Sequence, residues 1–128
     1  MKNYRSGVFT PPRRRVCPHE DRVAEILAVA GHNVEFLLEN EQKSPDILLD
    51  GVEFEIKSPK SVSANTLEHL LKKGLKQCPN LIIDTSRTKM RDDKMRNFLT
   101  TQMRKTKQIK KMLLVTKKGQ IIDIFSLI

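Results

Sequence analysis

Residues 45–57 read PDILLDGVEFEIK, and this stretch decides the fold. At its centre Asp50-Gly51 separates two runs of alternating apolar residues, and an Asp-Gly pair in that position is a strong signal for a β-hairpin with a two-residue turn. Such a turn places Asp46 opposite Glu55 on the partner strand. The sequence therefore predicts a hairpin whose core face carries Ile47, Leu49, Val52, Phe54 and Ile56.

The other face of this hairpin is polar, because Glu53, Glu55 and Lys57 alternate with the apolar residues and Asp46 joins them from the facing strand. Directly opposed Cβ atoms lie about 5 Å apart, so two carboxylates in that position repel each other. A divalent cation would remove the repulsion and use both groups as oxygen ligands. Lys57, one pleat beyond Glu55, could then orient or deprotonate a water molecule. The alternative is an exposed, solvated polar face.

Outside the hairpin, the pattern of apolar residues and helix boundaries predicts helices and further strands. Upstream we expect a helix over residues 18–30 that ends at Gly31, a strand over residues 34–38, and a polar connection over residues 40–44. Downstream we expect four elements: a helix over 63–77, a buried parallel strand over 81–83, a basic helix over 90–108, and a C-terminal hairpin over 112–125 that turns at Lys118-Gly119.

This order predicts a single-domain α/β fold with one mixed central sheet. The helices and strands follow the order α-β-β-β-α-β along the chain, and the basic helix and the C-terminal β-hairpin come after them. We divide the chain into an extended basic arm, residues 1–16, and one domain, residues 17–128, because 128 residues suffice for a single core.

Glu20 lies on the expected buried stripe of the first helix, with Val23, Ala24, Leu27 and Ala30. An acid at this end of the stripe either caps the helix start or is a third member of the acidic site, and the two roles are compatible.

Several classes of protein are excluded by composition. No run of about 18 apolar residues is present, so no membrane span is predicted. The first residues lack an apolar stretch, which predicts no secretory signal and a cytoplasmic location. Cys17 and Cys78 lack the spacing of a zinc site and are expected to be unpaired thiols.

The three histidines are scattered, and we expect surface or capping roles for them. For Asp84, at a strand end, we expect a cap or an ion pair.

The net charge of +9 is distributed unevenly. Residues 1–16 carry five bases and no acid, residues 17–59 carry ten acids and three bases, and residues 87–128 carry twelve bases and three acids. Basic segments around an acidic centre indicate binding of nucleic acid, with solubility as the alternative. The candidate phosphate-binding residues are Arg13, Arg14, Arg15, Arg91, Lys94, Arg104, Lys105 and Lys107.

Pro45-Asp46 followed by Glu55-Ile56-Lys57 resembles the signature of the PD-(D/E)xK nucleases, and the resemblance covers residues 19–86. It implies a restriction-endonuclease-like fold in which Asp46 and Glu55 bind Mg²⁺ or Mn²⁺ and Lys57 assists the attacking water. In this family a glutamate of the first helix often joins the site, here Glu20. Gln77 lies where some members have a supporting glutamine; the alternative is an ordinary polar residue in a last helical turn.

A narrower resemblance is to the C-terminal nuclease domains of contact-dependent growth inhibition toxins and their mobile-element relatives. It rests on several segments: His19-Glu20, Ser44-Pro45-Asp46, Glu55-Ile56-Lys57-Ser58-Pro59, Lys76-Gln77 and Leu81-Ile82-Ile83-Asp84. Many such domains cleave tRNA, and each is neutralised by an immunity protein. Some related toxins are metal-independent ribonucleases that use histidine, lysine or threonine.

The combined prediction is a metal-dependent nuclease that hydrolyses phosphodiester bonds in tRNA or DNA. The alternatives are a non-catalytic nucleic-acid-binding module on the same scaffold, a metal-independent toxin ribonuclease, and a protein-binding antitoxin.

Overall fold

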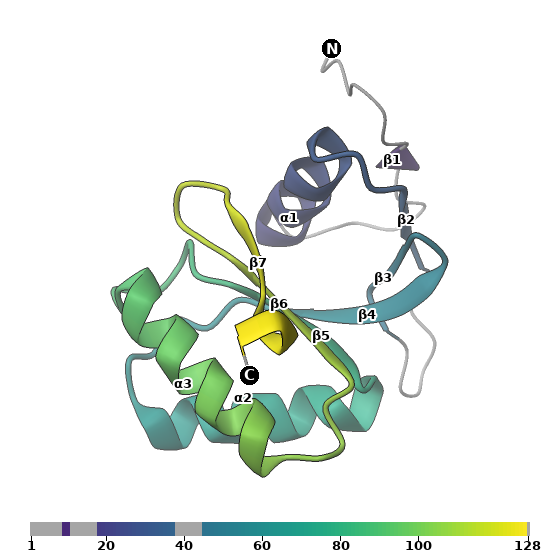
Figure 1. The fold of residues 1–128 in the computed structure, drawn as a ribbon. Helices are drawn as coiled ribbons and strands as arrows, with labels where there is room; N and C mark the ends of the chain where they lie inside the picture. The colour runs from purple at the N-terminus through teal and green to yellow at the C-terminus, as the bar shows by residue number, and fades with distance from the viewer. Residues whose placement is uncertain (1–8, 11–17, 38–44, 128) are drawn as a thin grey trace.

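The computed structural model describes residues 9–10, 18–37 and 45–127 (Figure 1). The helices are α1 (Pro18–Val29), α2 (Ala64–Gln77), α3 (Asp92–Lys105) and the short 3₁₀ helix η1 (Ile124–Leu127). The strands are β1 (Phe9–Thr10), β2 (Val34–Phe36), β3 (Ile47–Leu49), β4 (Val52–Lys57), β5 (Asn80–Asp84), β6 (Lys111–Val115) and β7 (Ile121–Asp123).

Within the described residues the strands form one seven-stranded sheet in the order β1-β2-β3-β4-β5-β6-β7. The pairs β1–β2, β4–β5 and β5–β6 are parallel, whereas β2–β3, β3–β4 and β6–β7 are antiparallel. The predicted α/β class, the mixed sheet, the basic helix and the C-terminal hairpin are thereby confirmed. The pairing of β1 with β2 and the 3₁₀ helix were not predicted.

The Asp50-Gly51 turn is present with the expected register, since Ile47 pairs with Phe54 and Leu49 with Val52. Both turn residues have positive φ, 51° for Asp50 and 83° for Gly51, as a type I′ turn requires.

The predicted pairing of Asp46 with Glu55 is not continued in the ladder, which ends at the pair Ile47–Phe54. The N–H of Asp46 instead donates to the carbonyl oxygen of Phe54 at 3.0 Å. The backbone is therefore offset by one residue here, as in a β-bulge, and the two carboxylates are not directly opposed.

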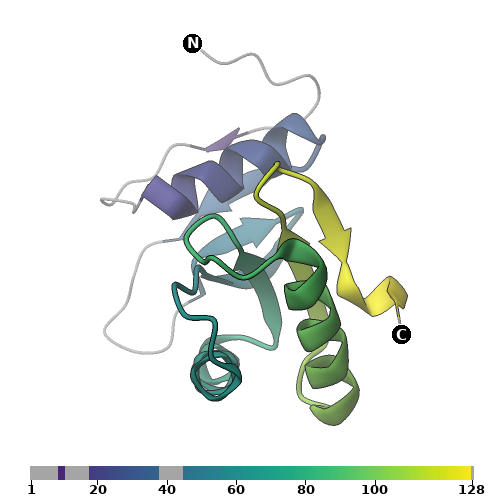
Figure 2. The ribbon, with the colours of Figure 1, turned by 90° about the vertical axis from the view of Figure 1, so that its left-hand side faces the viewer.

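Helices cover both faces of the sheet (Figure 2). On one face α1 buries Val23, Ala24, Leu27 and Ala28 against Ile47, Phe54 and Ile56. On the other face α2 and α3 bury Leu67, Leu71, Met95 and Leu99 against Leu81 and Ile83. The prediction that Ala30 belongs to the buried stripe is wrong: α1 ends at Val29, and Ala30 is exposed.

Several boundaries are shorter than expected. Strand β7 ends at Asp123, whose side chain accepts the N–H of Phe125 and thereby starts the final 3₁₀ turn. Helix α3 begins at Asp92, where two acids favour the positive end of the helix dipole. The polar connection over residues 40–44 and most of the basic arm lie outside the described residues. No helix among the described residues is long and apolar enough to cross a membrane.

Candidate functional site

Glu55 and Lys57 lie next to each other on the face of β4 that is covered by α2. Their partners in β5, Leu81 and Ile83, belong to the core on that side of the sheet. Only 5% of Glu55 is exposed, and its Oε2 lies 3.2 Å from Nζ of Lys57. The alternative of a solvated polar face is therefore wrong for Glu55.

A glycine in α2 makes room for the lysine. A Cβ atom added to Gly74 would lie 3.4 Å from Cε of Lys57 and 3.0 Å from Cδ2 of Leu81. The aliphatic part of Lys57 thus runs closely over the helix backbone, and the amino group is directed to Glu55. This role of Gly74 was not predicted, because a helical pattern alone does not show which face of the helix meets a lysine.

Asp46 is also buried, and its Oδ2 accepts the backbone N–H of Ile56 at 2.7 Å. Burial and then the charge of Asp46 raise the pKa of Glu55 to about 7, and Lys57 opposes this shift only in part. The structure thus brings together Asp46, Glu55 and Lys57, the three residues of the predicted catalytic motif. Their catalytic and metal-binding roles stay predictions.

Glu55 in β4 and Gln77 in the last turn of α2 each carry an unsatisfied side-chain oxygen. Oε1 of Glu55 and Oε1 of Gln77 are buried and have no hydrogen-bond partner among the described residues. A buried unsatisfied oxygen is unfavourable unless an ion, a water molecule or a ligand satisfies it.

The neighbouring carboxylates of Asp46 and Glu55 fit Mg²⁺ or Mn²⁺, because Mg²⁺ usually binds one or two carboxylates and keeps several waters or substrate oxygens. In the described part of the chain no group of three or more His, Cys, Asp or Glu side chains is arranged to hold a metal. A site here would accordingly rest on Asp46 and Glu55. Glu20, in the first turn of α1, is half-buried, and its roles as cap or third ligand stay predictions.

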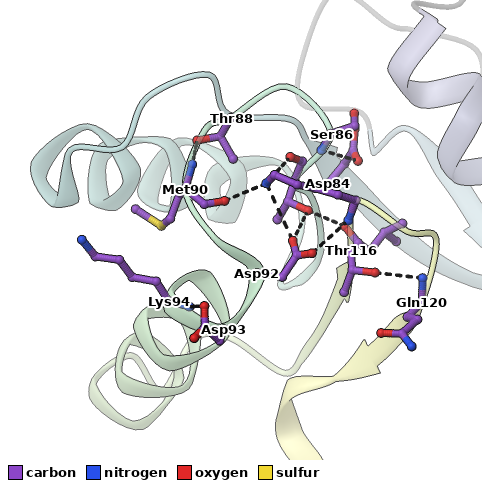
Figure 3. A network of polar contacts seen from close by, with 12 residues as sticks. Asp84, Ser86, Thr88, Met90, Asp92, Asp93, Lys94, Thr116 and Gln120 are labelled. Carbon is purple, nitrogen blue, oxygen red and sulfur yellow. Dashed lines mark hydrogen bonds and ion pairs between the residues drawn. The ribbon is translucent and has the colours of Figure 1, made fainter.

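A second buried carboxylate, Asp84, lies where β5 ends and organises the neighbouring loops (Figure 3). It is fully buried and forms an ion pair of 2.6 Å with Arg22 of α1. It also accepts the hydroxyl groups of Ser58 at 3.0 Å and Ser86 at 2.7 Å. The expectation of a cap or an ion pair for Asp84 is confirmed. Arg22 and Ser58 were missed because their partner is 62 and 26 positions away, and Ser86, two positions from Asp84, was missed because the strand pattern does not show a turn there.

A further polar network fixes the start of α3 beside this edge (Figure 3). Asp92 accepts the hydroxyl of Thr85 at 2.7 Å and the N–H of Lys117 at 3.2 Å. The Lys117 amino group donates to the carbonyl of Met90 at 2.7 Å. Helix α3 therefore begins at the edge of the sheet where β5 and β6 end.

The predicted phosphate-binding residues of the C-terminal half are all on the surface. Arg91, with 83% of its side chain exposed, forms an ion pair with Asp93, whereas the others are exposed cations: Lys94, Arg104, Lys105 and Lys107. Arg13, Arg14 and Arg15 lie outside the described residues.

Of the remaining singled-out residues, His32 and Cys78 have structural contacts. Nδ1 of His32 lies 2.7 Å from Oδ2 of Asp50, so the expected capping role of a histidine applies to the hairpin turn. The Cys78 thiol is free and buried, and it donates to the carbonyl of Glu53.

Two comparisons with known proteins found a match. The family described as "Contact-dependent growth inhibition CdiA C-terminal domain" matches residues 43–121, more than half of the chain. Among solved structures, the "CdiA-CT/CdiI toxin and immunity complex from Burkholderia pseudomallei" contains a chain with a TM-score of 0.70 and 15% sequence identity. The match covers 91% of this chain and 98% of that chain, and at this identity it shows a shared fold. No curated protein sequence matches.

Proposed function

The chain belongs to the contact-dependent growth inhibition CdiA C-terminal domain family, and from this premise we propose that it is a toxin domain with nuclease activity. The reaction would be hydrolysis of phosphodiester bonds in nucleic acid, with tRNA as the first substrate to test and DNA as the second. We further assign its site to the PD-(D/E)xK type.

The observation that carries this proposal is the position of Glu55. Its carboxylate is buried beside Asp46 and Lys57, has a pKa raised to about 7, and keeps one oxygen without a hydrogen-bond partner among the described residues. A group placed only for stability would not combine burial, a like charge and an unused oxygen.

Asp46 and Glu55 would hold Mg²⁺ or Mn²⁺. When bound, such an ion neutralises charge on the scissile phosphate and lowers the pKa of a bound water. Lys57 would hold or remove a proton of the attacking water with its amino group, which the ion pair with Glu55 and the close approach of Gly74 keep in position. Gln77 would support the site through its buried amide oxygen.

The test is cleavage of tRNA and of plasmid DNA with Mg²⁺, with Mn²⁺ and with EDTA, for the wild type and two matched variants. Glu55→Gln removes the proposed ligand, and Glu53→Gln changes an exposed glutamate of the same strand. We expect metal-dependent cleavage that Glu55→Gln abolishes and Glu53→Gln retains. Cleavage that persists in EDTA or in Glu55→Gln would exclude the metal mechanism.

The main alternative is a metal-independent ribonuclease or a binding module without turnover. It is favoured by the finding that the described residues contain no group of three metal-ligating side chains. The same experiment distinguishes these two alternatives. Cleavage in EDTA indicates a metal-independent ribonuclease, and tight binding of nucleic acid without cleavage under any condition indicates a binding module.

We also propose that an immunity protein binds and neutralises this chain, because the structural relative was solved as a toxin and immunity complex. Expression of the chain should arrest bacterial growth, and coexpression of the cognate immunity protein should restore it. Growth arrest that is absent in Glu55→Gln would link the toxicity to the same site.

A further inference from the structure

A pocket of about 440 Å³ lies beside the Asp84 network, between the first turn of α1 and the loop after β5. It is lined by Pro18, His19, Arg22, Ser86 and Arg87. Two guanidinium groups and one imidazole thus contribute to its wall, and none of the lining residues is acidic. The function proposed above makes no use of this pocket.

The wall of the pocket is rigid on one side. Nη1 of Arg22 is held by Asp84, and its Nη2 donates to the carbonyl oxygens of Thr116 at 2.9 Å and Lys117 at 3.1 Å. Ser86 is fixed by its own bonds to Asp84, through both its hydroxyl and its backbone N–H. The pocket is therefore largely formed before any ligand binds, which reduces the entropic cost of binding.

The opposite side carries a second guanidinium group, that of Arg87. Arg87 is exposed and forms no ion pair with any residue that the structure describes, and its Nη1 lies 3.4 Å from Nδ1 of His19. Because a guanidinium can only donate, Nδ1 accepts in this contact, and the N–H of the ring is then on Nε2. Burial and then the charge of Arg87 lower the pKa of His19, so the ring is neutral near pH 7.

The pocket and the proposed catalytic carboxylates lie at the same part of the sheet. Ser58, which directly follows Lys57, donates to the Asp84 carboxylate that also holds Arg22 and Ser86. From the other side, His19 is close enough to Asp46 for that charge to affect its pKa. A chain of nucleotides bound across Glu55 would thus have a phosphate within reach of this pocket.

We propose that the pocket binds a backbone phosphate of the nucleic acid next to the scissile one, with Arg87 as the cation that contacts it. The proposal rests on the nuclease function above and names a positioning subsite for it. Guanidinium groups bind phosphate oxygens in bidentate geometry, and the N-terminus of α1, a twelve-residue helix, adds favourable backbone dipoles. The subsite also offsets the repulsion that the acidic centre exerts on a polyanion.

The first test uses inorganic phosphate as the probe, without metal, and follows backbone amide chemical shifts. Wild type should show saturable shifts at His19, Ser86 and Arg87. Arg87→Ala should weaken this binding about tenfold, the effect of losing about 1.4 kcal/mol, and Lys73→Ala, which removes an exposed charge from α2, should leave it unchanged. Arg22 is unsuited as the test because its loss would leave Asp84 buried without a cation.

A wild type without saturable shifts at these amides, or an Arg87→Ala variant that binds phosphate as well as the wild type, would overturn the proposal. Arg87 is exposed, so the variant should fold; its unfolding curve should match that of the wild type.

The second test separates this proposal from the nuclease function. In the metal-dependent cleavage assay Arg87→Ala should raise KM about tenfold with kcat nearly unchanged, because the residue binds a phosphate that does not react. Cleavage by the wild type with an unchanged KM in Arg87→Ala would overturn the subsite and leave the nuclease in place. Phosphate binding at the pocket in a protein that cleaves nothing would overturn the nuclease and, with it, the role of the pocket in substrate binding.

Discussion

The buried position of Glu55 lowers the free energy of unfolding, and the size of this effect depends on pH. Its pKa is about 7 in the folded protein and 4.5 ordinarily. Between these values the folded state binds more protons than the unfolded state, so the free energy of unfolding falls as pH rises from 4.5 to 7. Above pH 7 the penalty is complete, and it amounts to at most about 3 kcal/mol.

Glu55→Gln should therefore stabilise the protein at pH 8 and have little effect near pH 4, where both states carry a protonated carboxyl. Urea unfolding at the two pH values measures the difference. Glu53→Gln is the control. Because Glu53 is exposed, this substitution should change the free energy of unfolding by the same small amount at both pH values. A Glu55→Gln variant that is destabilised equally at both pH values would contradict the assignment of a buried, high-pKa carboxyl.

A second prediction at this residue concerns the metal. A divalent ion binds the deprotonated carboxylate, so its affinity should increase as pH rises through about 7. Mg²⁺ or Mn²⁺ should raise the melting temperature more at pH 8 than at pH 6, because binding to the folded state adds to its stability. Thermal unfolding with and without the ion measures this effect. Its persistence in Glu55→Gln would mean that the ion binds elsewhere.

At the scale of the elements, the Asp50-Gly51 turn connects the two strands that carry the site. Gly51 has a φ of 83° and open space around it, so a Cβ atom there meets no neighbour but forces a strained backbone. The turn is also tied to the end of α1, since Asp50 accepts the N–H of Asn33 at 2.8 Å and pairs with His32. These bonds lower the pKa of Asp50, with the His32 contact as the larger cause.

Gly51→Ala should lower the free energy of unfolding by about 1 kcal/mol, through the backbone alone. Chemical denaturation of the two proteins gives this value. Gly51→Asn is the matched variant. Asparagine tolerates positive φ, so the free energy of unfolding should fall by less in this variant than in Gly51→Ala. Equal losses in the two variants would indicate that packing, not backbone conformation, sets the requirement for glycine.

The local elements could be predicted where a single residue type determines the geometry. Asp50-Gly51 predicts the turn, and Gly31 follows the first helix as expected. Ser63, expected as the first residue of the second helix, is instead its N-cap, and its hydroxyl accepts the N–H of Thr66. The burial of Glu55 could not be predicted, because alternation in β4 shows two faces but not the α2 helix that covers the polar one. The local sequence pattern also does not show the one-residue backbone offset at Asp46. It does not show the ion pair between Arg22 and Asp84 either, because these two residues are 62 positions apart.

At the scale of the whole molecule, the basic helix α3 carries exposed cations between the two edges of the sheet. Helix α3 starts at the edge where Asp92 contacts Thr85 and Lys117, and its 14 residues extend about 20 Å to the opposite edge. Arg104, Lys105 and Lys107 are exposed at and just after its C-terminal end, near the point where the N–H of Lys110 donates to the carbonyl oxygen of Pro79, directly before β5. A nucleic acid that follows the helix would contact these cations.

Replacing Arg104, Lys105 and Lys107 together with alanine should weaken binding of tRNA or duplex DNA without loss of the fold, because all three are exposed. The slope of log affinity against log salt should decrease by about 0.9 for each lost phosphate contact on a duplex and by about 0.7 on a single strand.

The opposite behaviour is expected for Asp46→Asn, which removes a negative charge beside the substrate but keeps an amide oxygen that can accept the N–H of Ile56. This variant should lose turnover while its affinity for nucleic acid stays equal or increases. Fluorescence anisotropy across a range of salt concentrations, with cleavage measured in parallel, tests both surfaces. A triple-alanine variant with an unchanged salt slope would place the polyanion elsewhere. An Asp46→Asn variant with wild-type turnover would exclude Asp46 from the chemistry, because a neutral amide cannot replace the negative charge with which a carboxylate binds a divalent ion.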